Sequence, residues 1–498
     1  TYRYAANLSQ GVGLVYNPGQ HVLGTTTPGY AALLSAAGLV FGADTIPAAS
    51  RIINALCMLI AGGCAYLIAQ RLTRSRLVAA LALGLTLLSY ETLYGSLAGM
   101  ESPLFLTLLG VALLALVYGR TGPAALAAGM LALVRPEGAF VIGLFGLTFA
   151  VQTLRARHAL PLHKRFFNRE TLTIAAGLLL PGLIWALIAT TYYGSPIPQS
   201  VIAKRAGLYP LQVYDTVAGV VAYLGQSFGI RELSDENLLL FALIAGVSTL
   251  VLAFGALWIW RHARQLWLIP ALVFIMLAFY ATSKTQLFTY YFAFFNPLQS
   301  ICWWTGLYLL AQRLVGRKGR AARPYLAAIT GMLTLLPSLA AYPYASMING
   351  QALPENFSLP ILRLHEYDRI TRDLDLPDGT TVLMPEIGVL GFYMNGIQVL
   401  DSAGLVSPEA VVYFPVPAEQ RPALGAGVIP PQMVHDYQPD VIISLEIFGR
   451  NGIFNDDWLW ENYQIIMERR GDWLPWDSEA LWVLARNDFA ENVSITPD

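Results

Sequence analysis

Charged side chains are rare in this 498-residue chain, so each one beside an apolar segment is a candidate for chemistry. Only 13% of the residues are Asp, Glu, Lys or Arg, whereas 55% are hydrophobic and the mean hydropathy is +0.52. Soluble domains usually carry about 25% charged residues. Ionisable groups near a bilayer are energetically expensive and therefore mark functional positions. The composition excludes an ordinary soluble enzyme and indicates a polytopic membrane protein.

Two carboxylates border apolar segments. Glu101 follows Gly99 and Met100 at the mouth of a predicted span, where a carboxylate also interacts favourably with a helix N-terminus. Glu137 stands two residues after Arg135 in a short turn between two apolar segments. These opposite charges form either an ion pair that fixes the turn or a contact surface for a ligand.

Basic residues cluster after an aromatic and proline-rich stretch. Lys204 and Arg205 follow the segment 192–199, and Lys284 precedes Tyr290 by six residues. Two cations just above a membrane are suited to binding a phosphate. The alternative is that their aliphatic stems lie along apolar surface while the charged ends reach water.

Apolar segments must position these residues. A membrane-spanning helix needs roughly 20 apolar residues. The stretch Tyr30–Phe41 is too short to span and suits a position along the membrane surface. The sequence predicts ten spans, at about 48–70, 77–94, 104–118, 123–134, 138–154, 172–193, 238–260, 266–282, 289–312 and 325–341.

Charge divides the chain into two domains. Residues 1–341 hold 23 Lys/Arg and 9 Asp/Glu, a net charge of +14, whereas residues 342–498 hold 8 and 23, a net charge of −15. Every second loop between the predicted spans is basic, and together these loops carry 16 of the 23 basic residues. By the positive-inside rule they are cytoplasmic. The outer loops 1–47 and 194–237 and the acidic domain 342–498 then lie outside the cell membrane.

The predicted outer domain has an α/β pattern. Short strands are expected at 380–384, 396–400, 440–444 and 480–484, with a helix at 360–374 and a helical turn at 387–394. Because Thr1 is already outside in this topology, one further helix is expected upstream of it. The predicted fold is a polytopic α-helical membrane domain with a C-terminal extracytoplasmic α/β domain.

Other classes of site find little support in the sequence. The chain has no HExxH, GxSxG or P-loop motif and no paired-histidine metal spacing. Its three cysteines lie in apolar runs, which argues for core positions. The net charge of −1 without a basic block argues against a nucleic-acid partner.

Several specific motifs lie along nearly the whole chain, beginning in the first predicted outer loop. In chain order they are Tyr2-Arg3-Tyr4-Ala5-Ala6-Asn7-Leu8, Gly11–Gly19, Thr25-Thr26-Thr27-Pro28, Gly99-Met100-Glu101-Ser102-Pro103, Arg135-Pro136-Glu137-Gly138, Gly194-Ser195-Pro196-Ile197-Pro198, Pro385–Tyr393 and Leu400–Leu405. Together they resemble the polytopic GT-C glycosyltransferases, in particular the branch of the mycobacterial terminal arabinofuranosyltransferases and their bacterial relatives.

The resemblance implies an enzyme that transfers a hexose or pentose from a polyprenyl-phosphate donor to a glycan, lipid or protein acceptor on the outer face, with inversion. In that family the general base is a carboxylate just before the Tyr-Arg-Tyr-Ala stretch. That position is upstream of Thr1, which leaves Glu101 and Glu137 as weaker candidates. The resemblance also implies donor-phosphate contacts from Arg3, Arg135, Lys204, Arg205 and Lys284, and acceptor or sugar contacts from Tyr4, Asn17, Tyr290 and Glu386.

Three points stay open at the level of sequence. No cofactor is certain, although a divalent cation bridging the donor phosphate is compatible with the resemblance. A non-catalytic subunit of a larger membrane complex, or a transporter of lipid-linked sugars, is the alternative function. Internal symmetry and broken helices, which are frequent in transporters, are not evident in the sequence.

Overall fold

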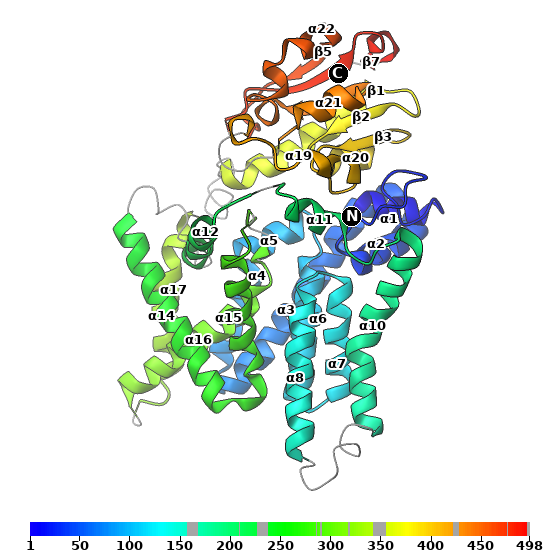
Figure 1. Cartoon of the computed structure of the whole chain (residues 1–498). Coiled ribbons are helices and arrows are strands. Elements are labelled where there is room, and N and C mark those ends of the chain that lie inside the picture. The colour runs from blue at the N-terminus through cyan, green and yellow to red at the C-terminus, as the bar shows by residue number, and fades with distance from the viewer. Residues whose placement is uncertain are drawn as a thin grey trace.

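The chain folds into a helical region with a smaller α/β domain above it (Figure 1). This computed structural model describes residues 1–156, 168–208, 210–226, 238–284, 286–288, 291–316, 319–341, 355–421, 428–475 and 477–495. The helical region extends from Thr1 to Ala341 and the α/β domain from Glu355 to Ile495. The structure is therefore mostly helical, with a sheet only near the C-terminal end.

Within the described residues, ten helices form the bundle of the helical region, and their ends follow from local sequence. Ser75 begins α4 by accepting a hydrogen bond from the Val78 amide, and Asn168 caps α10 in the same way. Gly194 ends α10 in the left-handed conformation, which glycine adopts without strain. The helices are α3 (Ile46–Thr73), α4 (Arg76–Leu88), α6 (Ser102–Val117), α7 (Thr121–Met130), α8 (Gly138–Ala156), α10 (Arg169–Tyr193), α14 (Leu238–His262), α15 (Leu268–Ala281), α16 (Phe295–Val315) and α17 (Arg323–Ala341).

The prediction of ten spans is only partly confirmed. In the described residues, four helices are long and apolar enough to cross a membrane: Ala43–Thr73, Gly138–Arg155, Arg169–Tyr193 and Ala242–His262. Shorter apolar helices occupy several of the other predicted positions. For example, α6 has 16 residues and is about 24 Å long, less than the roughly 30 Å of a bilayer core. The four apolar helices indicate a membrane-associated protein.

One predicted span is interrupted. The segment 77–94 forms α4 and then α5 (Tyr90–Leu97), separated at Ser89, whose backbone is extended. Polar side chains explain the break, because Ser89 and Thr92 bond to one another and to the Asn296 amide instead of continuing an apolar helix surface. The prediction of a single span there was wrong.

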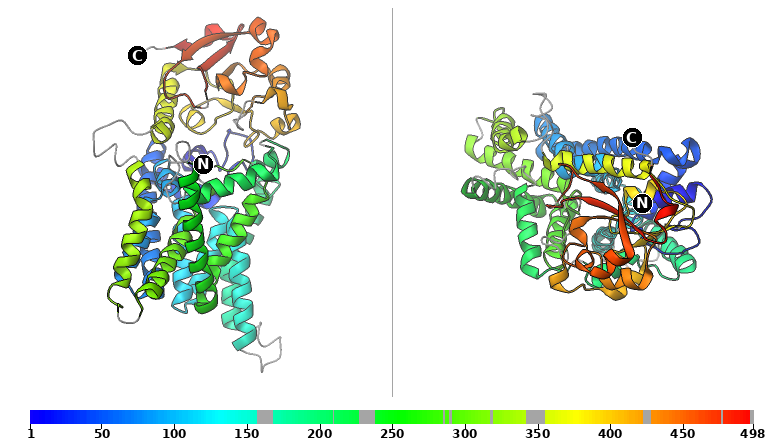
Figure 2. Two further views of the ribbon diagram at one scale, coloured as in Figure 1. Left: turned by 90° about the vertical axis from the view of Figure 1, so that its left-hand side faces the viewer. Right: turned by 90° about the horizontal axis from the view of Figure 1, so that it is seen from above.

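The described helix ends that border the basic loops lie at one end of the helical region. Figures 1 and 2 show the helix ends beside these loops opposite to the α/β domain. Arg157, Lys164, Arg165, Arg317 and Lys318 lie outside the described residues. The described basic residues at these helix ends are Arg71, Arg74, Arg76, Arg120, Arg155, Arg169, Arg261, Arg264, Arg313, Arg320 and Arg323.

Short helices lie where the helical region meets the α/β domain (Figure 1). The sequence predicted only one of them, since Tyr30–Phe41 forms most of α2. The others are too short or too polar for a span-length apolar pattern. They are α1 (Tyr2–Ser9), α2 (Pro28–Phe41), η1 (Ala43–Thr45), α11 (Gln199–Arg205) and α12 (Val213–Gln226).

The α/β domain contains a five-stranded mixed sheet of order β3-β2-β4-β6-β5. Its central strand β4 (Val441–Leu445) is buried along its whole length, as expected for a strand covered on both faces. Strand β2 (Thr381–Met384) pairs in parallel with β3 (Gln398–Asp401) and with β4. Strand β6 (Leu481–Arg486) is antiparallel to β4 and to the edge strand β5 (Tyr463–Arg469).

Helices and short elements complete this domain. The expected helix at 360–374 is part of α19 (Glu355–Asp373), and the expected turn contains α20 (Val389–Tyr393). The remaining elements are β1 (Leu374–Asp375) paired with β7 (Ser494–Ile495), η5 (Pro408–Tyr413), η6 (Ala418–Gln420), α21 (Pro431–Tyr437), η8 (Glu446–Phe448), η9 (Ile453–Asn455), α22 (Asp457–Asn462) and η10 (Ala490–Asn492).

Two main apolar cores correspond to the two regions, and the N-terminal segment joins them. Aromatic and aliphatic side chains of α3 to α8 and α14 to α16 form the larger core. The sheet forms the smaller core, which also includes Tyr4, Tyr16 and Ala31. The N-terminal segment that carries Tyr4, Tyr16 and Ala31 is thus packed into the core of the α/β domain, although it lies at the other end of the sequence.

Candidate functional site

A buried cluster of charges lies where the helical region approaches the α/β domain. The Arg135 guanidinium donates from Nη1 to Glu101 Oε1 at 2.8 Å. It also makes a two-point contact with Glu137, from Nη2 to Oε1 at 2.9 Å and from Nε to Oε2 at 3.2 Å. Arg135 is only 4% exposed. Such a planar, two-point pairing is the strong form of an arginine–carboxylate interaction.

Glycines explain why these residues meet. Gly138 follows Glu137, and a Cβ atom there would lie 2.5 Å from the backbone of Leu131, so only glycine fits. The turn therefore folds back on η2 (Leu131–Leu133) and presents Arg135 and Glu137 together. Gly99 has a φ of +68°, and a Cβ atom there would clash with the Tyr2 hydroxyl. This turn places Glu101 at the N-cap of α6.

Two tyrosines extend the cluster toward a lysine. The Tyr280 hydroxyl donates to Glu137 Oε1 at 2.8 Å. The Tyr291 ring lies between two cations, with the Arg135 guanidinium carbon 5.8 Å and Lys204 Nζ 5.0 Å from its centroid. Lys204 Nζ also donates to the Tyr291 hydroxyl. The cluster thus contains two carboxylates and two cations, whose formal charges cancel.

Glu137 and Glu101 differ in how many of their carboxylate oxygens accept hydrogen bonds. Burial alone raises the pKa of Glu137, but the adjacent Arg135 charge and the hydrogen bonds from Arg135 and Tyr280 lower this pKa more, to below its ordinary value. Glu137 is therefore a firmly ionised partner of Arg135. Among the described residues, hydrogen bonds reach only one oxygen of Glu101, Oε1. The second oxygen of Glu101 is the better placed to accept a proton from a bound group.

The start of the chain lies against the same cluster. Tyr2 and Tyr30 both donate to the Gly99 carbonyl, at 3.3 and 3.1 Å. The motifs around Tyr2 and Glu101, nearly 100 residues apart in sequence, therefore form one structural unit.

The other predicted phosphate ligands are spread more widely. Lys204 belongs to the cluster, whereas Arg205 and Lys284 are exposed. Lys284 has a φ of +52°, and its carbonyl accepts from the Leu211 amide at 3.1 Å, which joins its loop to the start of α12. Tyr290 lies outside the described residues.

Arg3 is engaged by the backbone instead of by acidic groups. Its guanidinium donates to the carbonyls of Tyr16, Gly391, Met394 and Ile397, at 2.9, 2.7, 3.5 and 2.9 Å. It therefore uses four of its five N–H donors to attach α1 to the α/β domain. Little donor capacity is left for a phosphate.

Asn17 serves the same attachment, whereas the Tyr4 hydroxyl makes hydrogen bonds within the N-terminal segment. The Tyr4 hydroxyl donates to the Val22 carbonyl and accepts from the Gly24 amide, at 2.7 and 2.8 Å. The Asn17 amide donates to the Val399 carbonyl at 2.8 Å and accepts from the Val399 amide at 3.0 Å. Both side chains are buried, so their observed contacts are structural.

Glu386 lies in a separate polar group under the sheet. Tyr367 donates a hydrogen bond to Glu386 Oε2, and Arg363 Nη1 lies 3.4 Å from Glu386 Oε1. Both partners come from α19. Tyr94 of α5 interacts electrostatically with Arg363 and Glu386, so this group faces the helical region.

Several functional candidates could not be found by motif reading. Tyr280 and Tyr291 contact the cluster from another part of the chain, and only folding brings them there. A buried polar network surrounds Asn296, whose amide donates to Ser89 Oγ and Thr92 Oγ1 at 2.6 and 2.7 Å. The sequence does contain a signal for this network, because Asn296 and Gln299 are polar residues one helical turn apart within an apolar segment.

Comparison with known proteins bears on the α/β domain alone. A family model described as "Domain of unknown function (DUF8728)" matches residues 363–490. This range runs from α19 to η10 and includes all five strands of the main sheet. No curated protein and no solved structure matches the chain.

Proposed function

We propose that this protein is a glycosyltransferase of the GT-C type that transfers a sugar from a polyprenyl-phosphate donor to an acceptor on the side of the α/β domain. One observation carries the proposal. Buried carboxylates and cations converge at the end of the helical region that faces the α/β domain. A lipid-linked donor would reach this place from the membrane, and a water-soluble acceptor would reach it from above.

The proposed reaction needs one base and one site for the leaving phosphate. The base accepts the proton of the acceptor hydroxyl while its oxygen bonds to the anomeric carbon. The bond between that carbon and the phosphate oxygen breaks, and polyprenyl phosphate leaves with the electron pair. We assign the base role to Glu101, whose second oxygen is available.

Lys204 is the best-placed cation for the leaving phosphate. It borders the cluster, and among the described residues it forms no ion pair with a carboxylate. Arg135 is held by two carboxylates and Arg3 by four carbonyls, so neither guanidinium is free to approach a phosphate. Arg205 is exposed one residue from Lys204 and would add charge at the rim.

The proposed setting is the plasma membrane, with several spans and an extracytoplasmic α/β domain. The support is the gathering of basic residues at the far end of the helical region, as the positive-inside rule expects of a cytoplasmic face. The acceptor is then a glycan, lipid or protein outside the cytoplasm.

Release of polyprenyl phosphate from a polyprenyl-phosphate sugar in membrane vesicles tests the proposal. Glu101→Gln is expected to reduce the release rate by about 100-fold or more, as for loss of a general base. Glu419→Gln, an exposed carboxylate of the α/β domain, is the matched control and should keep the wild-type rate. Lys204→Ala should lower the rate through loss of charge stabilisation.

A second candidate function has its own support. Arg135 engages both carboxylates, which is also the arrangement expected of an ion cluster that only fixes helices in a non-catalytic subunit or transporter. If Glu101→Gln and Lys204→Ala fold and release polyprenyl phosphate at the wild-type rate, or if the wild type shows no release with pentose or hexose donors, this second function is favoured.

A further inference from the structure

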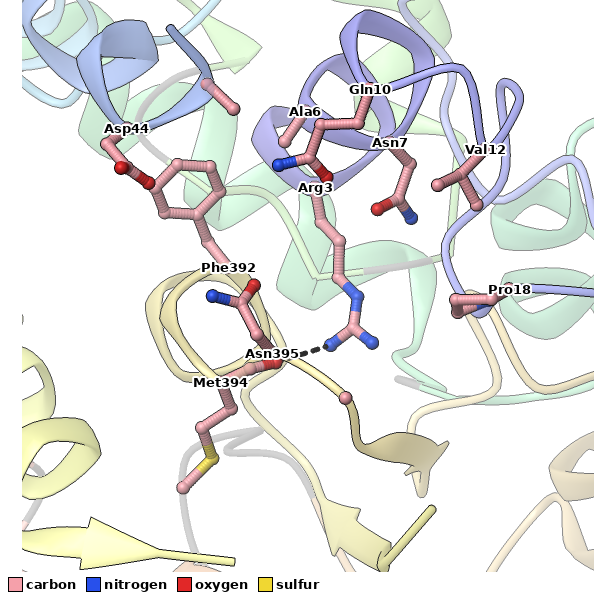
Figure 3. Close-up of a pocket in the computed structure, with 12 residues that line it drawn as sticks. Arg3, Ala6, Asn7, Gln10, Val12, Pro18, Asp44, Phe392, Met394 and Asn395 are labelled. Carbon is pink, nitrogen blue, oxygen red and sulfur yellow. Dashed lines mark hydrogen bonds between the residues drawn. The ribbon is translucent and has the colours of Figure 1, made fainter. Parts of the chain in front are cut away.

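A polar pocket separate from the charge cluster lies between α1 and the α/β domain (Figure 3). Its volume is about 330 Å³, near the lower end for small-molecule sites. One face of α1 contributes Arg3, Ala6 and Asn7, and Gln10 at the end of the helix continues this face, because it lies three and four residues after Asn7 and Ala6. Segments far apart in sequence complete it: Val12, Pro18, Ala43, Asp44, Phe392, Met394, Asn395 and Gly396.

The pocket is poorly suited to an anion. Arg3 is its only cationic residue, and four of the five Arg3 N–H donors already serve carbonyl groups. Figure 3 shows its guanidinium directed at the backbone beside Asn395. Asp44 adds a negative charge to the lining. A phosphate or carboxylate would meet this charge without a free cation to balance it.

Several polar side chains that line the pocket have free hydrogen-bonding capacity. Gln10, Asp44 and Asn395 are exposed, and within the described residues their side chains have no hydrogen-bond partner. Asn7 uses its amide N–H groups on the carbonyls of Val15 and Tyr16, which leaves its oxygen as an acceptor. The free groups therefore offer more acceptors than donors.

Apolar side chains line the rest of the pocket. Ala6, Phe392 and Met394 supply surface without hydrogen-bonding groups, and Figure 3 places the Phe392 ring between Asp44 and Arg3. The ring is fixed by an edge-on contact with Tyr2, at 5.7 Å between centroids. An aromatic side chain together with carboxylate and amide groups in one lining suits a ligand with both C–H faces and hydroxyl edges.

We propose that this pocket binds a neutral, hydroxyl-rich saccharide unit. Hydroxyl groups donate to Asp44 and to the amide oxygens, and they accept from the N–H groups of Gln10 and Asn395. The C–H face of the sugar ring packs on Ala6 and Phe392. This site is distinct from the charge cluster and needs none of the proposed transfer steps.

Two sources would present the same sugar chemistry. The C-terminal end of α2, just before Asp44, exposes Leu39, Val40 and Phe41, which are 69%, 72% and 70% exposed. A glycolipid would place its sugar in the pocket and its chain along this apolar end. A glycan chain end would use the pocket alone.

Saturation-transfer NMR with methyl glycosides of common hexoses and pentoses tests the proposal. The whole protein is placed in phosphatidylcholine nanodiscs, because maltoside detergents carry neutral sugars that would compete. We expect at least one glycoside to bind the wild type. Asp44→Ala and Asn395→Ala should each weaken its binding about tenfold, as for loss of a hydrogen bond to a charged or amide group. Asp375→Ala, an exposed carboxylate elsewhere, should not.

A second experiment distinguishes a glycolipid from a glycan chain as the source of the sugar. The same sugar is presented as a diacylglycerol glycoside in the nanodisc and compared with the methyl glycoside. If Phe41→Gln weakens only the lipid-linked form, the source is a glycolipid; if it weakens neither form, the source is a glycan chain.

Three results would overturn the inference. They are no binding of any methyl glycoside, unchanged affinity in both Asp44→Ala and Asn395→Ala, or displacement of the glycoside by inorganic phosphate. Failure of the proposed transfer reaction is seen independently, as absent polyprenyl phosphate release in vesicles. Glycoside binding that persists without such release retains the pocket and removes the transferase.

Discussion

Two buried arginines, Arg135 in the helical region and Arg3 at the base of the α/β domain, are stabilised in opposite ways. Arg135 is neutralised by two carboxylates, and Arg3 by the dipoles of four carbonyl groups. Their exposed fractions are similar, at 4% and 7%. Burial alone therefore does not distinguish a charge cluster that can do chemistry from a structural attachment.

The groups that contact a buried arginine determine what the arginine does in the structure. An arginine held by carboxylates lies where charge can be redistributed, because protonation of either acid changes the local balance. An arginine held by carbonyls contacts no carboxylate, so protonation of an acid does not change the charge around it. The helical region thus contains the electrostatically adjustable site, whereas the Arg3 region holds the two domains in register.

The largest effect is expected from Arg135→Met. This change leaves two buried carboxylates without their cation, which costs about 3–5 kcal/mol when one partner of a buried pair is removed. Unfolding can be followed with a thiol-reactive fluorophore, since Cys57, Cys64 and Cys302 are free and buried. A much lower thermal midpoint is expected.

Two further variants check the physical cause. Arg205→Met removes an exposed arginine and should change the free energy of unfolding by no more than about 0.5 kcal/mol. Adding Glu101→Gln and Glu137→Gln to Arg135→Met should recover stability, because no unpaired charge remains. A triple variant as unstable as Arg135→Met alone would show that packing, not charge, is responsible.

A smaller effect is expected from Arg3→Lys. Lysine keeps the charge but places its three donors on one nitrogen, so it cannot reach all the carbonyls that the guanidinium contacts. Buried carbonyls left unsatisfied cost roughly 1–3 kcal/mol. Hydrogen exchange should become faster in the segment that supplies three of these carbonyls, residues 391–397.

The matched control is Arg372→Lys, an exposed arginine of α19 that pairs with Asp368. It should leave exchange in residues 391–397 unchanged. Equal exchange in Arg3→Lys and in the wild type would mean that Arg3 does not hold the two domains together.

Periodicity identified many elements but not their lengths or partners. The four expected strands correspond to β2, β3, β4 and β6, because short β-branched runs flanked by turn residues are a strong local signal. Strand β5 was missed, since its outer position and register shift between Ile465 and Met467 weaken the alternation. The break of a predicted span at Ser89 was also missed, because its partner Asn296 is distant in sequence.

The sequence also predicted the candidate site only in part. Motif reading selected Glu101, Arg135, Glu137 and Lys204, and the structure brings all four together. Arg3 and Asn17, from two neighbouring motifs, instead bond to backbone groups of the α/β domain, and the Tyr4 hydroxyl bonds within the N-terminal segment. Sequence order cannot reveal this, because three of the four carbonyls that Arg3 contacts lie almost 400 residues away.

The smallest expected effect is that of pH on the thermal midpoint. This effect distinguishes the surroundings of Arg135 from those of Arg3 most directly. The folded state lowers the pKa of Glu137 below its ordinary value of 4.5, so Glu137 stabilises the protein fully above about pH 4.5. As pH falls from there toward the lowered folded pKa, this stabilisation is lost. The thermal midpoint of the wild type should therefore decrease with acidification below about pH 4.5.

Glu137→Gln should be less stable at neutral pH and should show a weaker decrease below pH 4.5, because the titrating group is gone. Glu419→Gln, with its exposed carboxylate removed, should keep the wild-type pH dependence. Arg3→Lys should lower the midpoint by the same amount at every pH, since no described contact of Arg3 titrates in this range. An unchanged acid slope in Glu137→Gln would mean that Arg135 does not control the ionisation of Glu137.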